Sequence, residues 1–99
     1  MRNADEEARI QANVEVIQGY LLGQFKGFEL TDKEDRPISH IFTATKSADE
    51  RYQLKVSWPQ LSDHSNTPER TQQRLITDDI AGRMKGKSQG EYFSWGKYN

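Results

Sequence analysis

The side chains best suited to acid–base chemistry in this chain are its two histidines, His40 and His64. His64 stands between Asp63 and Ser65, and these three residue types form the catalytic triad of many hydrolases. A triad is assembled from distant segments, however, and adjacent positions do not give its geometry. Asp and Ser side chains also form hydrogen-bonded turns in loops. We therefore interpret residues 63–65 as a turn and His40 as a core histidine with a satisfied ring nitrogen.

Other kinds of reactive site lack the residues that they need. The chain has no cysteine, so it can form neither a disulfide nor a thiolate zinc site. No histidine has a second plausible metal ligand three or four residues away. Gly82, Gly86 and Gly90 follow an expected helix, whereas a phosphate-binding loop precedes one. We predict no catalytic residue, cofactor or metal site, and hence a protein that is not an enzyme.

Cationic and aromatic side chains gather in residues 83–99. Four cations stand there against one acid, a net charge of +3, whereas the whole chain has a net charge of −1. Large rings and arginine are typical anchors of protein interfaces. We predict a binding or regulatory domain that contacts a protein partner through Arg83, Lys85, Lys87, Tyr92, Trp95 and Tyr98. Because Trp95 is expected at the surface, its replacement by alanine should leave the melting curve nearly unchanged.

The same region suggests an alternative, the binding of single-stranded nucleic acid. Arg70, Arg74 and Lys85 fall within about 60° on one continuous helix, and Lys97 extends the cationic region. Cations neutralise phosphates and exposed rings stack on unpaired bases, so this binding would weaken as salt rises. Both the protein partner and the nucleic acid stay open at this point.

Residues 4–22 are predicted to form the first helix. Asn3 and Glu6 have capping-box spacing, and Ile10, Val14, Ile17 and Leu21 form a core-facing stripe. The opposite face carries small residues that would allow a second helix to approach, which makes a homodimer conceivable: Ala8, Ala12, Gly19 and Gly23. Alanine is also the best helix former and needs no partner.

Three strands are predicted next, at 28–30, 38–45 and 51–58, with a charged turn at 31–37. The third strand alternates apolar and polar side chains. Pairing Lys46 with Glu50 puts one apolar face together, with Ala44, Phe42, His40 and Ile38 opposite Tyr52, Leu54, Val56 and Trp58. A slip of one residue would expel Phe42 from that face.

Residues 59–66 are predicted to be a loop, followed by a second helix. Thr67 and Pro68 are a typical helix start, and the helix should run to Gly82 or Lys85. Its apolar stripe consists of Ile76, Ile80 and Met84, assisted by Leu75. Residues 90–95 favour a short edge strand.

The elements together predict an α+β fold with two helices on one face of a small antiparallel sheet, in the order α-β-β-β-α with a short C-terminal strand. Ninety-nine residues make a single domain, 1–99, in which residues 83–99 form either an edge strand or a mobile tail. No membrane-spanning run or signal peptide is present, so we expect a cytoplasmic protein.

The order of helix, three strands and helix across roughly residues 3–85 resembles that of the double-stranded RNA-binding domain. In that family, lysines at the start of the second helix contact phosphates, whereas Thr67-Pro68-Glu69-Arg70 supplies one cation here. The first strand connection and the start of the first helix are acidic, although both contact RNA in the family. The resemblance is one of fold order and implies no activity.

Overall fold

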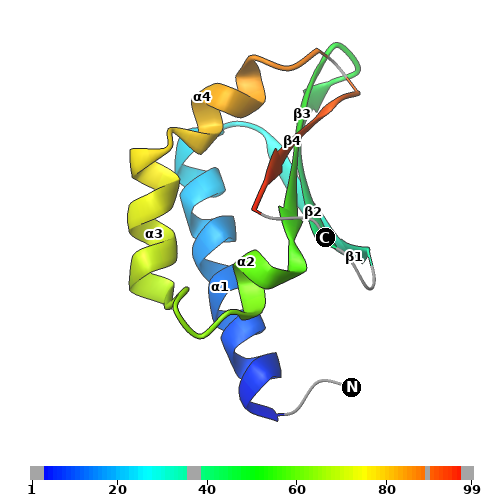
Figure 1. Ribbon diagram of the computed structural model, residues 1–99. Coiled ribbons are helices and arrows are strands. Elements are labelled where there is room, and N and C mark those ends of the chain that lie inside the picture. Colours follow the sequence, from blue (N-terminus) through cyan, green and yellow to red (C-terminus); the bar gives the residue numbers. More distant parts are fainter. Residues whose placement is uncertain (1–3, 36–38, 89, 97–99) are drawn as a thin grey trace.

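Helices cover one side of a four-stranded sheet (Figure 1). The computed structural model describes residues 4–35, 39–88 and 90–96. In chain order its elements are α1 (Ala4–Gln24), β1 (Glu29–Asp35), β2 (Ser39–Ser47), β3 (Glu50–Ser57), α2 (Trp58–Ser62), α3 (Pro68–Thr77), α4 (Ile80–Lys85) and β4 (Tyr92–Trp95). The predicted α+β class, and a short strand after the last helix, are confirmed. Within these ranges no helix combines the length and apolar character that a membrane crossing needs.

The sheet has the strand order β1-β2-β3-β4 and is mixed. β1, β2 and β3 pair antiparallel, but β4 lies parallel to β3, with Trp95 opposite Val56. The prediction of a purely antiparallel sheet is therefore wrong at its last strand. The reason is the connection: β4 is reached from β3 by a crossover through α2, α3 and α4, and such crossovers join parallel strands.

The predicted register of the central hairpin is confirmed. His40, Phe42 and Ala44 lie opposite Val56, Leu54 and Tyr52. The expected pairing of Lys46 with Glu50 is wrong, because a bulge at Lys46 leaves Ser47 opposite Glu50. The predicted partners Ile38 and Trp58 give no pair, since Ile38 lies outside the described residues and Trp58 begins α2.

β1 is longer than predicted and takes in most of the expected charged turn. It runs to Asp35, and every side chain in it except Leu30 is exposed. Charged residues are tolerated here because β1 lies at the edge of the sheet. Its backbone pairs with one neighbouring strand while water solvates its charged side chains. Residues 36–38, the end of the predicted turn, lie outside the described ranges.

The first helix matches its prediction closely. Ile10, Val14, Ile17 and Leu21 are all buried and belong to the core. The helix ends two residues later than expected, and Leu21 O accepts a bond of 2.8 Å from Phe25 N just beyond it. The predicted cap, Asn3, lies outside the described residues.

The predicted second helix is broken into α3 and α4. Its start is confirmed, since Thr67 Oγ1 accepts a bond of 3.2 Å from Arg70 N. Asp79 then adopts a left-handed conformation with φ of 49° and caps α4, accepting from Gly82 N. The break changes the phase of the buried face, so Leu75 is buried whereas Ile76, predicted to be core, is 62% exposed.

The predicted loop 59–66 contains a short helix, α2, in its first half. Ser57 caps this helix, with Oγ accepting a bond of 3.3 Å from Gln60 N. Pro59 stands in its first turn, where a missing N–H costs nothing. Leu61 is thereby turned into the core, which the loop interpretation did not anticipate.

Candidate functional site

β4 forms one edge of the sheet and carries both of the described aromatic side chains that were predicted to bind a partner. Tyr92 pairs with Gln53 on the face turned away from the helices and is 41% exposed. Lys55 Nζ lies 5.8 Å from the Tyr92 ring centroid. This ring is therefore available on the surface, as the sequence predicted.

Trp95 lies in the core, so the prediction that it is at the surface is wrong. It pairs with Val56 on the helix-covered face, is 7% exposed and belongs to the core. The alternation of side chains along a strand explains the difference, because Tyr92 and Trp95 are three residues apart and point to opposite faces. Tyr98 and Lys97, also predicted to bind, lie outside the described residues.

The predicted cations of the α4 region are at the surface. Arg83, Lys85 and Lys87 are all exposed. The Arg83 guanidinium lies 5.9 Å from the Phe93 ring centroid, and Arg83 Nε donates to Asp78 O over 2.7 Å. These contacts place Arg83 directly beside β4.

Arg70, Arg74 and Lys85 do not form the single helical face predicted for nucleic acid. All three are exposed, but the break at Asp79 puts Lys85 on α4, separate from the two arginines on α3. Lys85 Nζ instead lies 5.1 Å from the ring centroid of Phe25, at the end of α1.

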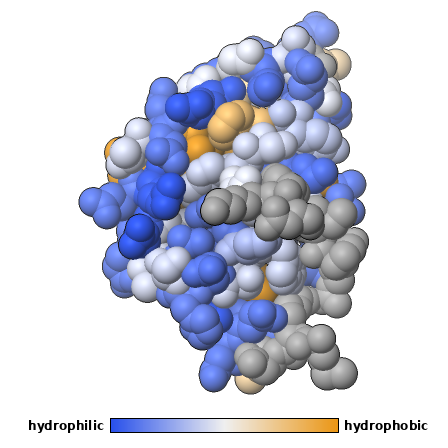
Figure 2. Space-filling view, in the orientation of Figure 1, coloured by the Kyte–Doolittle hydropathy of each residue, from blue (hydrophilic) through white to orange (hydrophobic). Residues whose placement is uncertain are grey.

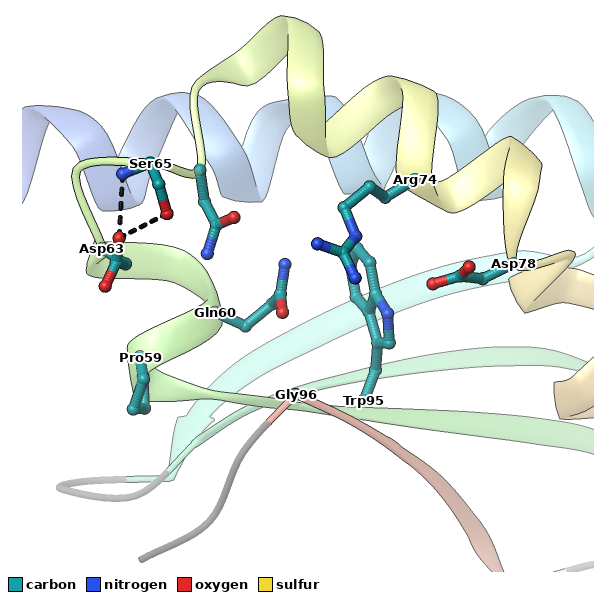
Figure 3. Close-up of a pocket in the computed structure, with 9 residues that line it drawn as sticks. Pro59, Gln60, Asp63, Ser65, Arg74, Asp78, Trp95 and Gly96 are labelled. Atoms are coloured by element: carbon teal, nitrogen blue, oxygen red, sulfur yellow. Dashed lines mark hydrogen bonds between the residues drawn. The ribbon is translucent and has the colours of Figure 1, made fainter.

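A pocket of about 440 Å³ opens where β4 ends. It lies between α2 with the following loop, α3, and the last residues of β4 (Figure 3). Its lining residues are Pro59, Gln60, Asp63, Ser65, Asn66, Arg74, Asp78, Trp95 and Gly96. Arg74, predicted for nucleic acid, and Trp95, predicted for a protein partner, thus meet at one site.

Gln60 and Arg74 bring unused hydrogen-bond donors to the pocket. Figure 3 shows Gln60 pointing up from α2 and Arg74 down from α3 toward the same space. Gln60 Nε2 is buried and has no hydrogen-bond partner among the described residues. Within the described parts of the chain, the Arg74 guanidinium makes no hydrogen bond or ion pair.

Asp63 and Ser65 form the predicted turn at the rim of the pocket. Asp63 Oδ1 accepts from Ser65 N over 2.8 Å and from Ser65 Oγ over 2.6 Å. These bonds hold the pKa of Asp63 below its ordinary value. His64 is exposed, and its Nδ1 lies 3.1 Å from a guanidinium nitrogen of Arg9. The predicted turn at residues 63–65 is therefore confirmed.

Gly96 keeps the floor of the pocket closely packed. Its φ is 101°, and a Cβ at this position would collide with Ser57 Oγ and lie 2.8 Å from Gln60 Cβ. Only glycine fits a backbone of this conformation at this distance. The close approach joins the end of β4 to the start of α2.

Asn13 on α1 holds the other wall of the pocket, and the sequence analysis missed it. Its Nδ2 donates to Leu61 O and Asn66 O, each over 2.8 Å. Its Oδ1 accepts from Thr71 Oγ1 over 2.9 Å. One fully buried amide thus links α1 to α2, to the following loop and to α3. The only sequence signal was a polar residue beside Val14 on the apolar face of α1.

His40 is buried, as predicted, with one ring nitrogen satisfied. Its Nε2 donates to Asp32 Oδ2 over 2.7 Å, and Gln18 Nε2 donates to Asp32 Oδ1 over 2.8 Å. His40 Nδ1 is buried and has no hydrogen-bond partner in the described part of the chain. Among the described residues no three potential metal-ligating side chains come together.

The small residues of α1 lie on a surface that is largely open. Ala8, Gly19 and Gly23 are exposed and Ala12 is half-buried. A Cβ added at Gly19 or Gly23 would meet nothing within 4 Å in the described structure. Homodimerisation through this face stays a prediction.

Comparison of the chain with protein-family models, with curated proteins and with solved structures gave no significant match.

Proposed function

We propose that this protein is a non-catalytic binding domain that captures a protein partner along β4. The carrying observation is the contrast between the two edges of the sheet. Among the seven residues of β1, Glu29, Asp32, Lys33, Glu34 and Asp35 are charged, whereas β4 reads Tyr-Phe-Ser-Trp and has no charge. Charged edge strands oppose pairing with another chain, and uncharged ones favour it.

An added strand would gain both main-chain hydrogen bonds and side-chain contacts beside β4. The main chain supplies affinity and side-chain pockets supply specificity in this mode of recognition. Tyr92 is exposed, and Arg83 lies beside Phe93 of the same strand. Lys85 and Lys87 are exposed and precede β4 in the chain. Figure 2 shows a mostly hydrophilic surface with a small hydrophobic area near α4 and β4. These features favour an extended partner segment that carries acidic residues.

The test begins with a displayed library of random peptides selected on the folded protein. We expect the selected peptides to slow the exchange of β4 amides with solvent and to leave β1 amides unchanged. Replacing Tyr92 with serine should weaken their binding about tenfold, because an exposed interface ring is lost.

The matched control is Leu22→Ser, which removes another exposed apolar side chain, on α1, and should leave binding unchanged. Failure to select any peptide, or protection of β1 in place of β4, would contradict the proposal. So would equal effects of the two serine variants.

The nucleic-acid alternative has less support, because the helix break divides the cations on which it relied. It predicts that a labelled single-stranded oligonucleotide binds at low salt and is released as salt rises. Absence of binding at low salt would end this alternative.

A further inference from the structure

The pocket lies where a strand parallel to β4 would end. β4 runs from Tyr92 to Trp95, and Trp95 and Gly96 both line the pocket. A peptide added in the same direction would therefore bring its carboxyl end to this opening. An antiparallel peptide would bring its amino end.

The unmet hydrogen-bonding capacity of the pocket favours the carboxyl end. Within the described structure, Gln60 Nε2 is buried and lacks an acceptor, and the Arg74 guanidinium is unpaired. Asp63, by contrast, already accepts two bonds from Ser65. A carboxylate would accept charge-assisted hydrogen bonds from Arg74 and satisfy the Gln60 amide.

The acids of the pocket limit the charge that a ligand can carry. Asp63 and Asp78 line the same space as Arg74. Figure 3 shows Asp78 reaching toward the pocket from the end of α3. Two carboxylates beside one guanidinium repel a dianion such as phosphate more strongly than a monoanion, so a single carboxylate is the anion better suited to the two donors.

We propose that this pocket binds the C-terminal carboxylate of a peptide that lies parallel to β4. The inference rests on the proposed function and deepens it, because it names the end of the partner that is recognised. The buried indole of Trp95 would form the wall against which the last residue packs.

The test compares two synthetic probes, N-acetyl-tetraalanine with a free carboxylate and the same peptide with a C-terminal carboxamide. Binding is followed by the indole N–H resonance of Trp95, with that of Trp58 as the internal reference. We expect the carboxylate peptide to bind about tenfold more tightly than the carboxamide. Arg74→Gln should abolish the difference, and Arg70→Gln, an exposed arginine one turn earlier on α3 and outside the pocket, should preserve it. Inorganic phosphate should give no shift.

Equal binding of the carboxylate and carboxamide peptides would overturn the inference, as would an Arg74→Gln variant that keeps the preference. Failure of the edge-strand proposal gives a different pattern. A shift by acetate that depends on Arg74, without protection of β4 amides by any peptide, would support the carboxylate site and contradict strand addition. If the carboxylate and carboxamide peptides protect β4 amides equally, strand addition is supported and the carboxylate site is contradicted. Both arginines are exposed, so both variants should fold, and thermal unfolding checks this.

Discussion

Replacing Asn13 with alanine should remove the link between α1 and the segments that form the pocket. Three hydrogen bonds of 2.8, 2.8 and 2.9 Å are lost, each contributing about 1 kcal/mol net. Leaving the Leu61 carbonyl and the Thr71 hydroxyl without partners raises the loss to about 3–4 kcal/mol. Alanine is the better helix former by about 0.6 kcal/mol. We therefore expect a net loss of about 3 kcal/mol, out of a total stability of about 5–15 kcal/mol.

Urea unfolding measures this loss, as a lower midpoint with an unchanged slope. The matched control is Gln11→Ala, which removes an exposed 3.1 Å bond to Glu15 on the same helix and should cost less than about 0.5 kcal/mol. Thr71→Val removes one partner of Asn13 and should cost about 1–2 kcal/mol. If Asn13→Ala does not fold, Thr71→Val still tests the hydrogen bond between the two side chains.

The double variant Asn13→Ala/Thr71→Val should lose about 1 kcal/mol less unfolding free energy than the sum of the two single losses, because the two side chains share a hydrogen bond. A loss below about 1 kcal/mol for Asn13→Ala, or independent effects of the two changes, would refute the role assigned to the buried amide.

Two further predictions concern the residues around the pocket. Trp95→Ala should lower the free energy of unfolding by about 3–5 kcal/mol, because a buried ring is removed from the core, whereas Tyr92→Ala should lower it by less than about 1 kcal/mol. Thermal unfolding compares the two variants, and an unchanged midpoint for Trp95→Ala would contradict its burial. The carboxyl resonance of Asp63 should titrate below the ordinary pKa of an aspartate, and Ser65→Ala should raise that pKa toward normal. The turn therefore contributes stability above the pKa of unfolded Asp63 and loses it as pH falls through the lower folded pKa; identical titrations in both proteins would contradict this reasoning.

Periodic burial explains which parts of the fold were predictable from sequence. The stripe from Ile10 to Leu21 and the alternation around Leu54 are repeated signals, so α1 and the β2–β3 register follow from them. The start of β1 was predicted, but its extension to Asp35 was missed because the charged residues resemble a turn, although an edge strand in water can carry them. The break at Asp79 was missed because aspartate rarely adopts positive φ, and its cost is offset only by capping and packing that the chain pattern does not display.

The candidate site was only partly predictable, because it depends on contacts between distant segments. Arg74 and Trp95 were both singled out, but for different partners, and nothing in the sequence indicated that they meet. Asn13 gave only a weak signal, its place beside Val14 on the apolar face of α1, and Gln60 gave none, since a polar side chain in a helix is usually solvated. Their roles depend on which carbonyl groups and which strand the crossover brings beside them.

The parallel pairing of β4 affects the order in which the domain is assembled. β1, β2 and β3 pair with neighbours in sequence, so their contacts close short loops at little entropic cost. β4 has to wait for three helices to be arranged across the sheet before it meets β3, and such non-local pairing is slow. The protein should therefore form the β1–β2–β3 sheet first, and β4, the strand proposed to bind the partner, should join it last.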